Sequence, residues 1–218
     1  MNLLKKCSAI FVFGLVAIAN ANAGVIIGQL YNTGLDASGP VVTLDNGGID
    51  GNWDVPAGTD AVTYFNNAYL ANDANSKWIS SKSDGANETT VRTDYEFVTT
   101  FDLTGYNAST ANIMGSWGVD NYATIWLNGL DTGVSLDFGT SSFNTLTSFS
   151  ISDFFVSGIN TLMVKVTNGY DTDAAREPGP MALRFDNMSL TADVPAPGTF
   201  ALLGIALAGL GFSRRAKR

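Results

Sequence analysis

Two stretches of the chain alternate between inward and outward positions and decide its fold class: residues 95–103, YEFVTTFDL, and residues 161–168, TLMVKVTN. Every second residue of the first stretch falls on one face, and three of those five residues are aromatic. In the second stretch, Leu162, Val164 and Val166 share a face in the same way. A period of two is typical of antiparallel strands with one buried face. Both stretches are therefore predicted as half-buried strands.

Further candidate strands surround these two and are separated by Gly, Asn and Asp clusters. They are GVIIGQLY at 24–31, PVVTL at 40–44, TIWLNG at 124–129, LTSFSI at 146–151 and MALRF at 181–185. Asn128-Gly129 after a strand predicts a tight hairpin, because both positions tolerate positive φ. No internal repeat and no Pro- or Ser-rich linker divides residues 24–193. We therefore expect one all-β domain, an antiparallel β-sandwich, over this range.

The first 23 residues, MNLLKKCSAIFVFGLVAIANANA, have the pattern of a secretory signal peptide. Two lysines precede an apolar run, and Ala21 and Ala23 place small residues where a signal peptidase cuts. Cleavage is expected before Gly24. The run is too short for a retained transmembrane helix, which needs about 20 apolar residues.

The last residues form a second apolar run with a basic end. Residues 199–212, TFALLGIALAGLGF, would span about 21 Å as a helix, against a hydrocarbon core of about 30 Å. Arg214 and Arg215 can snorkel to the lipid headgroups and, with Lys217 and Arg218, would stay on the cytoplasmic side. The run predicts a weak transmembrane helix with residues 24–193 outside the cytoplasm.

Charge and residue usage exclude several function classes. Residues 24–193 contain six Lys and Arg against twenty Asp and Glu, a formal charge of −14, which repels nucleic-acid phosphates. The chain has no histidine, so Ser-His-Asp catalysis and His-ligated zinc are excluded. Its one cysteine, Cys7, lies in the signal peptide, so the exported protein has no disulfide.

The C-terminal pattern resembles a known sorting signal. The motif Val194-Pro195-Ala196-Pro197-Gly198, the apolar run and the basic end resemble the PEP-CTERM signal of Gram-negative bacteria that make extracellular polysaccharide. The resemblance implies that an exosortase, a membrane cysteine protease, removes the helix. The protein would be anchored in the inner membrane before processing and reach the cell surface or extracellular matrix afterwards. This chain has Ala196 where that family usually has glutamate. An ordinary C-terminal anchor is the alternative, because hydropathy alone does not separate the two.

Four motifs in the body resemble a second family. They are YxFxTTFDL from residue 95, SWGVDN at 116–121, IWLNG at 125–129 and GINTLMVKVTN at 158–168. In this order they resemble galactose-binding-like jelly rolls, which recur in bacterial surface proteins and as accessory domains of glycoside hydrolases. The resemblance implies a jelly-roll sandwich, and domains of this family often carry one structural calcium ion.

Tryptophans are the candidate ligand-binding residues, because an indole face stacks on the C–H face of a sugar ring. Trp53 lies in a turn-rich stretch, and Trp126 has the opposite parity from Ile125 and Leu127. Trp117 lies in a strand-like run and is expected in the core. Burial of all the tryptophans in the sandwich is the alternative, since aromatic residues usually supply core area.

A glycine-punctuated loop contains the candidate metal ligands Asp45, Asn46, Asp50 and Asp54. Hard oxygen ligands and tight turns suit calcium, although the spacing differs from that of the EF-hand loop. Ordinary Asx-turns would use the same residue types, so both interpretations stay open. No cofactor is certain from the sequence.

Three functions remain. The first is a non-enzymatic exported protein of the cell surface or extracellular matrix, associated with exopolysaccharide or biofilm and processed by signal peptidase and exosortase. The second is a carbohydrate-binding module, with or without a stabilising calcium ion. The third is a carboxylate-based hydrolase, which needs two facing carboxyl groups at a defined separation. The sequence contains no arrangement that identifies such a pair, so we do not expect an enzyme.

Overall fold

The computed structural model of this chain describes residues 23–25, 30–36, 44–55, 59–86, 92–137, 142–169 and 179–195. These residues form eleven strands and no helix, so none of them builds a helix able to cross a bilayer. Residues 22–194 belong to one compact unit. The expected signal peptide up to residue 22 and the expected helix at 199–212 lie outside the described residues. So do the candidate processing residues Ala21, Ala196, Pro197, Gly198, Arg214 and Arg215.

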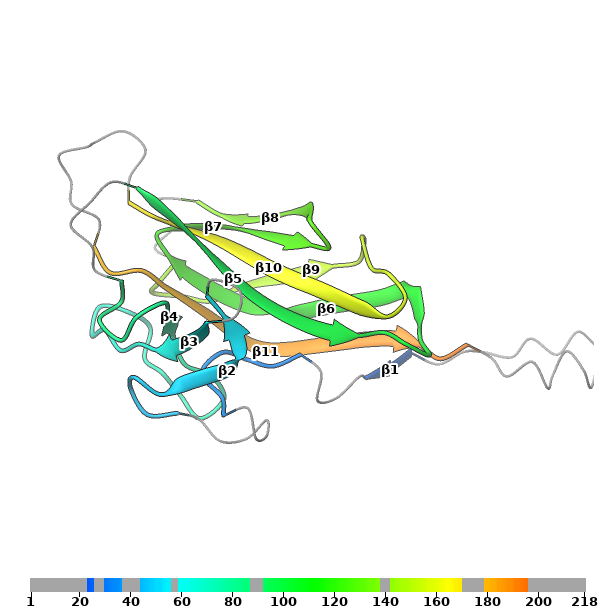
Figure 1. Cartoon of the computed structure of the whole chain (residues 1–218), viewed down its shortest axis with the longest axis horizontal. Helices are drawn as coiled ribbons and strands as arrows, with labels where there is room; N and C mark the ends of the chain where they lie inside the picture. Colours follow the sequence, from blue (N-terminus) through cyan, green and yellow to red (C-terminus); the bar gives the residue numbers. More distant parts are fainter. Residues whose placement is uncertain are drawn as a thin grey trace, which may run out of the picture. The chain divides into compact units, whose positions relative to one another are not determined.

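The strands build two layers of an antiparallel sandwich (Figure 1). The first layer has the order β8 (Leu130–Leu136), β7 (Tyr122–Leu127), β10 (Ile159–Asn168) and β5 (Thr93–Asp102). The second has the order β9 (Thr147–Ile151), β6 (Asn107–Asp120), β11 (Ala182–Asp193), β4 (Ile79–Ser80), β3 (Asp60–Thr63) and β2 (Ile49–Asp54). The short strand β1 (Ala23–Val25) pairs with the end of β11.

The chain crosses between the layers at each connection from β5 to β11, except at the β7–β8 hairpin. One backbone pair, Asp54 with Val98, joins β2 to β5 and connects the two layers along one side. This alternation gives a jelly-roll sandwich and confirms the predicted all-β fold class. The predicted hairpin is confirmed as well, because Asn128 and Gly129 link β7 to β8 with φ values of 53° and 79°.

The alternating stretches have the predicted orientation. On β5, Phe97, Thr99 and Phe101 are buried, and on β10 the apolar residues of even number are buried. The two strands pair over their whole length, with Val164 opposite Phe97. Because paired residues share a face, both apolar rows enter the same core.

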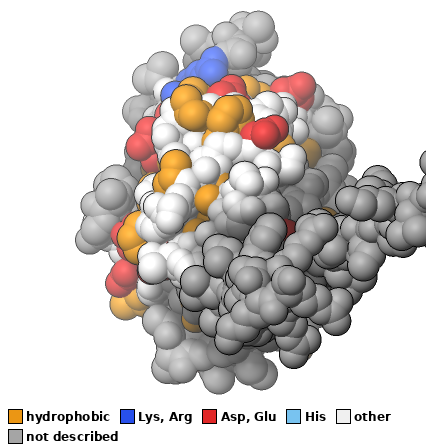
Figure 2. All heavy atoms as spheres, turned by 90° about the vertical axis from the view of Figure 1, so that its right-hand side faces the viewer, with side chains coloured by type: hydrophobic (Ala, Val, Ile, Leu, Met, Phe, Trp, Pro, Cys, Tyr) orange, Lys and Arg blue, Asp and Glu red, His pale blue; other side chains and the backbone are white. Residues whose placement is uncertain are grey.

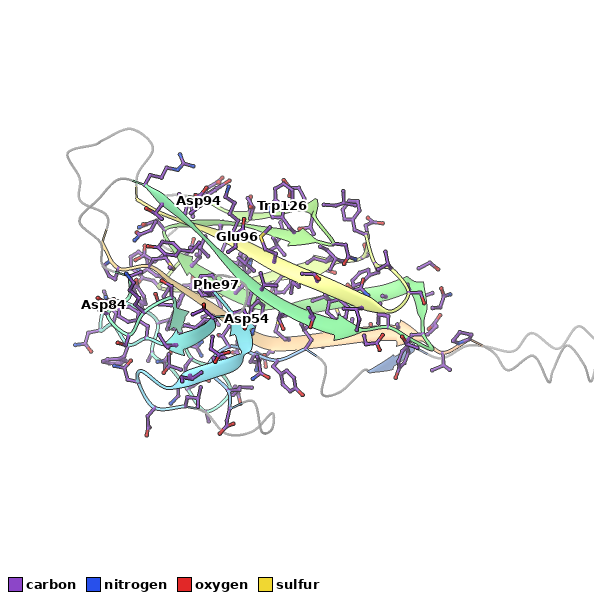
Figure 3. The ribbon with its side chains drawn as sticks, viewed as in Figure 1. Asp54, Asp84, Asp94, Glu96, Phe97 and Trp126 are labelled. Carbon is purple, nitrogen blue, oxygen red and sulfur yellow. The ribbon has the colours of Figure 1, made fainter. Side chains whose placement is uncertain are left out.

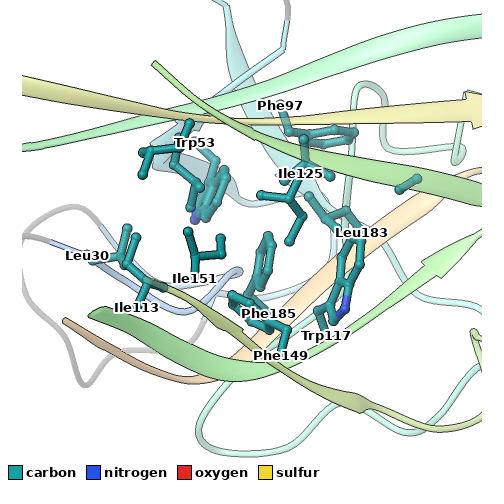
Figure 4. Packing of buried hydrophobic residues seen from close by; sticks show 14 of the residues in the cluster. Leu30, Trp53, Phe97, Ile113, Trp117, Ile125, Phe149, Ile151, Leu183 and Phe185 are labelled. Carbon is teal, nitrogen blue, oxygen red and sulfur yellow. The ribbon is translucent and has the colours of Figure 1, made fainter. Parts of the chain in front are cut away.

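The core is centred on a stack of three aromatic rings (Figure 4). Phe185 of β11 lies between Trp53 of β2 and Trp117 of β6, with ring centroids 5.2 Å and 5.8 Å apart and interplanar angles of 13° and 10°. Burying one such indole contributes about 4–6 kcal/mol by area, as an upper estimate. Side chains of both layers pack in this one cluster, so the core fixes the layers against each other.

A buried arginine ties the loop before β4 to β11. Arg184 donates hydrogen bonds to Ser76 Oγ at 2.8 Å, to the Ala71 carbonyl at 2.7 Å and to Asp73 Oδ2 at 2.7 Å. Its side chain is 1 % exposed, whereas that of Asp73 is 49 % exposed. Partial burial raises the pKa of Asp73, but hydrogen bonds from Asn75, Ser76 and Arg184 outweigh burial and hold it below the usual value. Each nitrogen of the Arg184 guanidinium therefore donates one hydrogen bond within the fold.

Candidate functional site

The outward face of the β8–β7–β10–β5 layer carries a row of register partners that continues onto β2. Trp126 of β7 lies opposite Met163 of β10, Met163 lies opposite Val98 of β5, and Val98 lies opposite Asp54 of β2. Figure 3 shows Trp126 and Asp54 on opposite sides of β10 and β5. We call this set the cross-strand row. It places an aromatic side chain at one end and a carboxylate at the other.

Trp126 is half-buried on this face, as its opposite parity from Ile125 and Leu127 predicted. Its Nε1 donates a hydrogen bond to Thr124 Oγ1 at 2.9 Å, which fixes the plane of the indole. The neighbouring Ile125 and Leu127 are fully buried. An oriented, partly exposed indole of this kind can stack on an apolar ligand face.

A pocket of about 160 Å³ opens at the other end of the row, beside Asp54. It is lined by Tyr31, Asn52, Asp54, Val98, Thr99 and Thr100. Asn52 and Asp54 flank the inward-pointing Trp53 on β2, so both side chains point away from the core. The pocket therefore offers amide, carboxylate and hydroxyl groups close together.

The wall of the pocket is held by hydrogen bonds to the core. Trp53 Nε1 donates to the Tyr31 carbonyl at 3.4 Å, and Asn52 Nδ2 donates to the Leu35 carbonyl at 3.1 Å. Thr33, two residues after Tyr31, exchanges backbone and side-chain hydrogen bonds with Phe185. The segment around Tyr31 is thereby fixed to β11 before any ligand arrives.

The face is acidic, and the cation that it carries is already paired. Among the described side chains of β2, β5, β7, β8 and β10, Lys165 is the only cation, and its Nζ lies 2.8 Å from Asp94 Oδ2. The hydrogen bond that Lys165 donates to Asp94, together with the negative charge of Asp94, raises the pKa of Lys165. Partial burial raises the pKa of Asp94, but Lys165 and Thr167 outweigh burial and lower it. Figure 2 shows acidic side chains spread over another face of the molecule too, with the cations at one edge.

Trp53 does not belong to this site, contrary to its candidacy as a ligand-binding residue. Its side chain has no exposed surface and stacks on Phe185 in the core. A register irregularity in β2 between Asp50 and Asp54 explains the orientation, because it turns both Asp50 and Trp53 inward. Trp117 lies in the core as expected.

The four candidate calcium ligands do not converge. Asp45 and Asn46 are exposed in a turn, Asp54 lines the pocket, and Asp50 is buried. Asp50 Oδ2 accepts from the Gly34 N–H at 2.6 Å and Oδ1 from the Asn52 N–H at 3.1 Å, as an Asx-turn residue would. Within the described ranges, no group of three or more acidic side chains could hold a metal ion.

Sequence reasoning missed the pocket and therefore Tyr31, Asn52 and Thr100. These residues come from three segments far apart in the chain, and their proximity depends on the Asp54–Val98 pair. The one feature of the sequence that pointed to the pocket was the alternation of side chains around Trp53. A buried Trp53 in a strand would have placed Asn52 and Asp54 on the opposite face.

The C-terminal residues carry a recognised motif. Residues 193–215 match the PEP-CTERM protein-sorting motif, which confirms the resemblance found in the sequence. No curated protein matches the chain.

Several solved structures resemble the described fold. CBM35 from Paenibacillus barcinonensis has a TM-score of 0.36 and 18% identity, covering 65% of this chain and 94% of that one. A carbohydrate-binding module, CBM36, in complex with calcium and xylotriose has a TM-score of 0.26 and 16% identity, covering 66% and 92%. A GH2 beta-galacturonidase from Eisenbergiella tayi bound to glycerol has a TM-score of 0.31 and 15% identity, covering 75% of this chain and 24% of that one.

Proposed function

We propose that this chain is a non-enzymatic exported protein that binds extracellular polysaccharide through the outward face of its β-sandwich. The PEP-CTERM motif at residues 193–215 supports export and sorting. Signal peptidase and an exosortase are its processing partners, and the cell surface or extracellular matrix is its destination. Signal peptidase would cut the chain before Gly24, and the exosortase would cut it within the motif that begins near Val194.

The observation that carries the binding function is the position of Trp126. It is the one tryptophan of the four with exposed surface, since Trp53, Trp78 and Trp117 are at most 1 % exposed. Its indole is oriented by Thr124 and has Met163 of β10 and Asp131 of β8 as its cross-strand neighbours. Stacking on an indole with polar groups at its rim is the chemistry that recognises sugars.

A hydrolase is the weaker alternative. The buried carboxylates Asp50 and Asp120 have raised pKa values, but each is engaged by hydrogen bonds within the fold. Neither lines the pocket beside Asp54. The experiment described next also tests whether calcium stabilises the binding module.

The test is binding of the exported protein to purified extracellular polysaccharide, followed by tryptophan fluorescence, with calcium and then with a chelator. Because the other tryptophans are buried, a ligand-dependent change in emission reports on Trp126. Trp126→Ala should weaken binding at least tenfold, which corresponds to about 1.4 kcal/mol. Leu130→Ala is the matched control, since Leu130 is 51 % exposed on the adjacent hairpin and lies outside the cross-strand row.

Saturable binding that Trp126→Ala abolishes and Leu130→Ala preserves would support the proposal. An affinity that Trp126→Ala leaves unchanged would refute it and leave a surface protein without a glycan site on this face. Loss of binding in the presence of the chelator would show that binding depends on calcium.

A further inference from the structure

We propose that the pocket beside Asp54 is a second sugar subsite, and that one uncharged glycan chain spans from it to Trp126. The glycan would cross β2, β5, β10 and β7 at right angles to the strands. This inference rests on the glycan-binding function proposed above and adds the length and the charge class of the ligand.

The spacing of the strands sets the length of the ligand. Trp126, Met163, Val98 and Asp54 are successive register partners, so three strand spacings separate the two ends of the row. At about 4.8 Å per spacing the row is about 14 Å long, which exceeds a single pyranose ring. A monosaccharide can therefore occupy one end only, whereas a chain of several sugars can reach both.

The middle of the row suits the apolar face of a sugar chain. Met163 and Val98 are half-buried and supply uncharged surface between the two ends. Thr161 and Thr100, opposite each other on β10 and β5, lie beside them and supply hydroxyl groups. A glycan lying across these strands would contact methyl and thioether groups below it and hydroxyls at its side.

The pocket suits sugar hydroxyls, and it is pre-formed. Asn52, Asp54 and Thr100 present donors and acceptors within one hollow of about 160 Å³. Hydrogen bonds from Trp53 to the Tyr31 carbonyl and from Asn52 to the Leu35 carbonyl fix its wall. A fixed wall reduces the entropy lost when a ligand binds.

The charges on this face select an uncharged ligand. Asp54, Asp94, Glu96, Asp102 and Asp131 lie on the described strands around the row, and these strands carry one cation, Lys165. Lys165 is engaged by Asp94 at 2.8 Å. Uronate or sulfate groups on a glycan would therefore approach carboxylates and find no unpaired cation on these strands.

The experiment uses fragments of the polysaccharide that the exported protein binds. Partial hydrolysis gives fragments of one to six sugars, and anion exchange separates neutral from uronate-containing ones. We expect affinity for the neutral fragments to rise at least tenfold between two and four sugars. Asp54→Ala and Thr100→Ala, made in the whole chain, should each reduce this gain to less than threefold. Asp102→Ala, which also removes one carboxylate from β5, should leave the gain unchanged.

Three outcomes would overturn the inference while the proposed function stands. The first is an affinity that no longer rises beyond two sugars. The second is a gain with length that survives both Asp54→Ala and Thr100→Ala. The third is binding of the uronate-containing fragments in preference to the neutral ones. Absence of any binding to the intact polysaccharide would instead refute the proposed function, and the second subsite with it.

Discussion

Lowering the pH from 7 to 5 is expected to stabilise the β-sandwich, because two of its carboxyl groups are buried. Burial raises the pKa of Asp50 from 3.8 to about 6, against the opposing hydrogen bonds from Gly34 and Asn52. Burial likewise raises the pKa of Asp120 to about 6, although the Tyr69 hydroxyl donates a hydrogen bond to its Oδ2 at 2.7 Å. Asp50 has no exposed surface and Asp120 is 7 % exposed.

The sign follows from proton binding. Between the unfolded value of 3.8 and the folded value of about 6, the folded protein binds more protons, so its stability decreases as the pH rises through this window. A shift of about two units corresponds to about 3 kcal/mol per group when it is fully expressed. When the pH falls from 7 to 5, the folded state gains only part of this free energy, about 1.3 kcal/mol per group and about 2–3 kcal/mol for both groups.

Below about pH 4 the trend should reverse. The pKa values of Asp73 and Asp94 are lowered, because hydrogen bonds to their charged forms outweigh the effect of partial burial. Their contribution to stability is present above the unfolded pKa and is lost as they become protonated. Stability should therefore be highest between about pH 4 and pH 5.

Urea unfolding at pH 7, 6 and 5, with the free energy extrapolated to water, measures the effect. Asp120→Asn should remove about half of the pH dependence, whatever it does to stability at pH 7. Asp131→Asn, at an exposed position, changes the total charge equally and controls for general repulsion in this acidic protein. A free energy of unfolding that is flat or rises from pH 5 to pH 7 would refute the reasoning. So would an equal loss of pH dependence in both variants.

Two further predictions concern packing and the buried cation. Gly118→Ala should destabilise the protein by about 1–3 kcal/mol in urea unfolding, because a Cβ there would lie 2.5 Å from the Ser142 carbonyl oxygen. Gly179→Ala is the control, because its Cβ would have nothing within 4 Å, and it should change stability by less than about 0.5 kcal/mol. Equal effects of the two substitutions would contradict the packing argument. Asp73→Ala should lower the free energy of unfolding by about 1–2 kcal/mol, because it removes one hydrogen-bond partner of the buried Arg184. The loss is limited because the Asp73 side chain is half exposed. An unchanged unfolding midpoint would show that water replaces the carboxylate.

The sequence was most informative where the chain is regular. The alternation in residues 95–103 and 161–168 predicted two strands and the faces they bury, because a period of two leaves one choice once a core exists. The same parity argument placed Trp126 on the outward face. These predictions needed no knowledge of which strand lies next to which.

The sequence was misleading where the period is broken. Asp50 and Trp53 are three residues apart and both point inward, so no alternation marks them. The glycines around Asp50 made the stretch appear to be a loop, and its oxygen-rich composition suggested a calcium site. In the structure those oxygens partly serve the backbone of the fold. The pocket beside Asp54 could not be predicted, because it depends on a single long-range backbone pair between β2 and β5.

The place of β11 in the sheet has a mechanical consequence for a protein that is held by its end. β11 runs from Ala182 to Asp193, the residue at which the sorting motif begins, and it pairs with β6 on one side and with β4 and β1 on the other. If the proposed anchoring at the C-terminal end and the proposed polysaccharide binding both hold, a pulling force would enter through β11 and leave through the opposite layer. Pulling along a long interior strand strains many of its hydrogen bonds in shear at once. Resistance to such pulling depends on the rate of forced unfolding, and we expect this strand order to slow it.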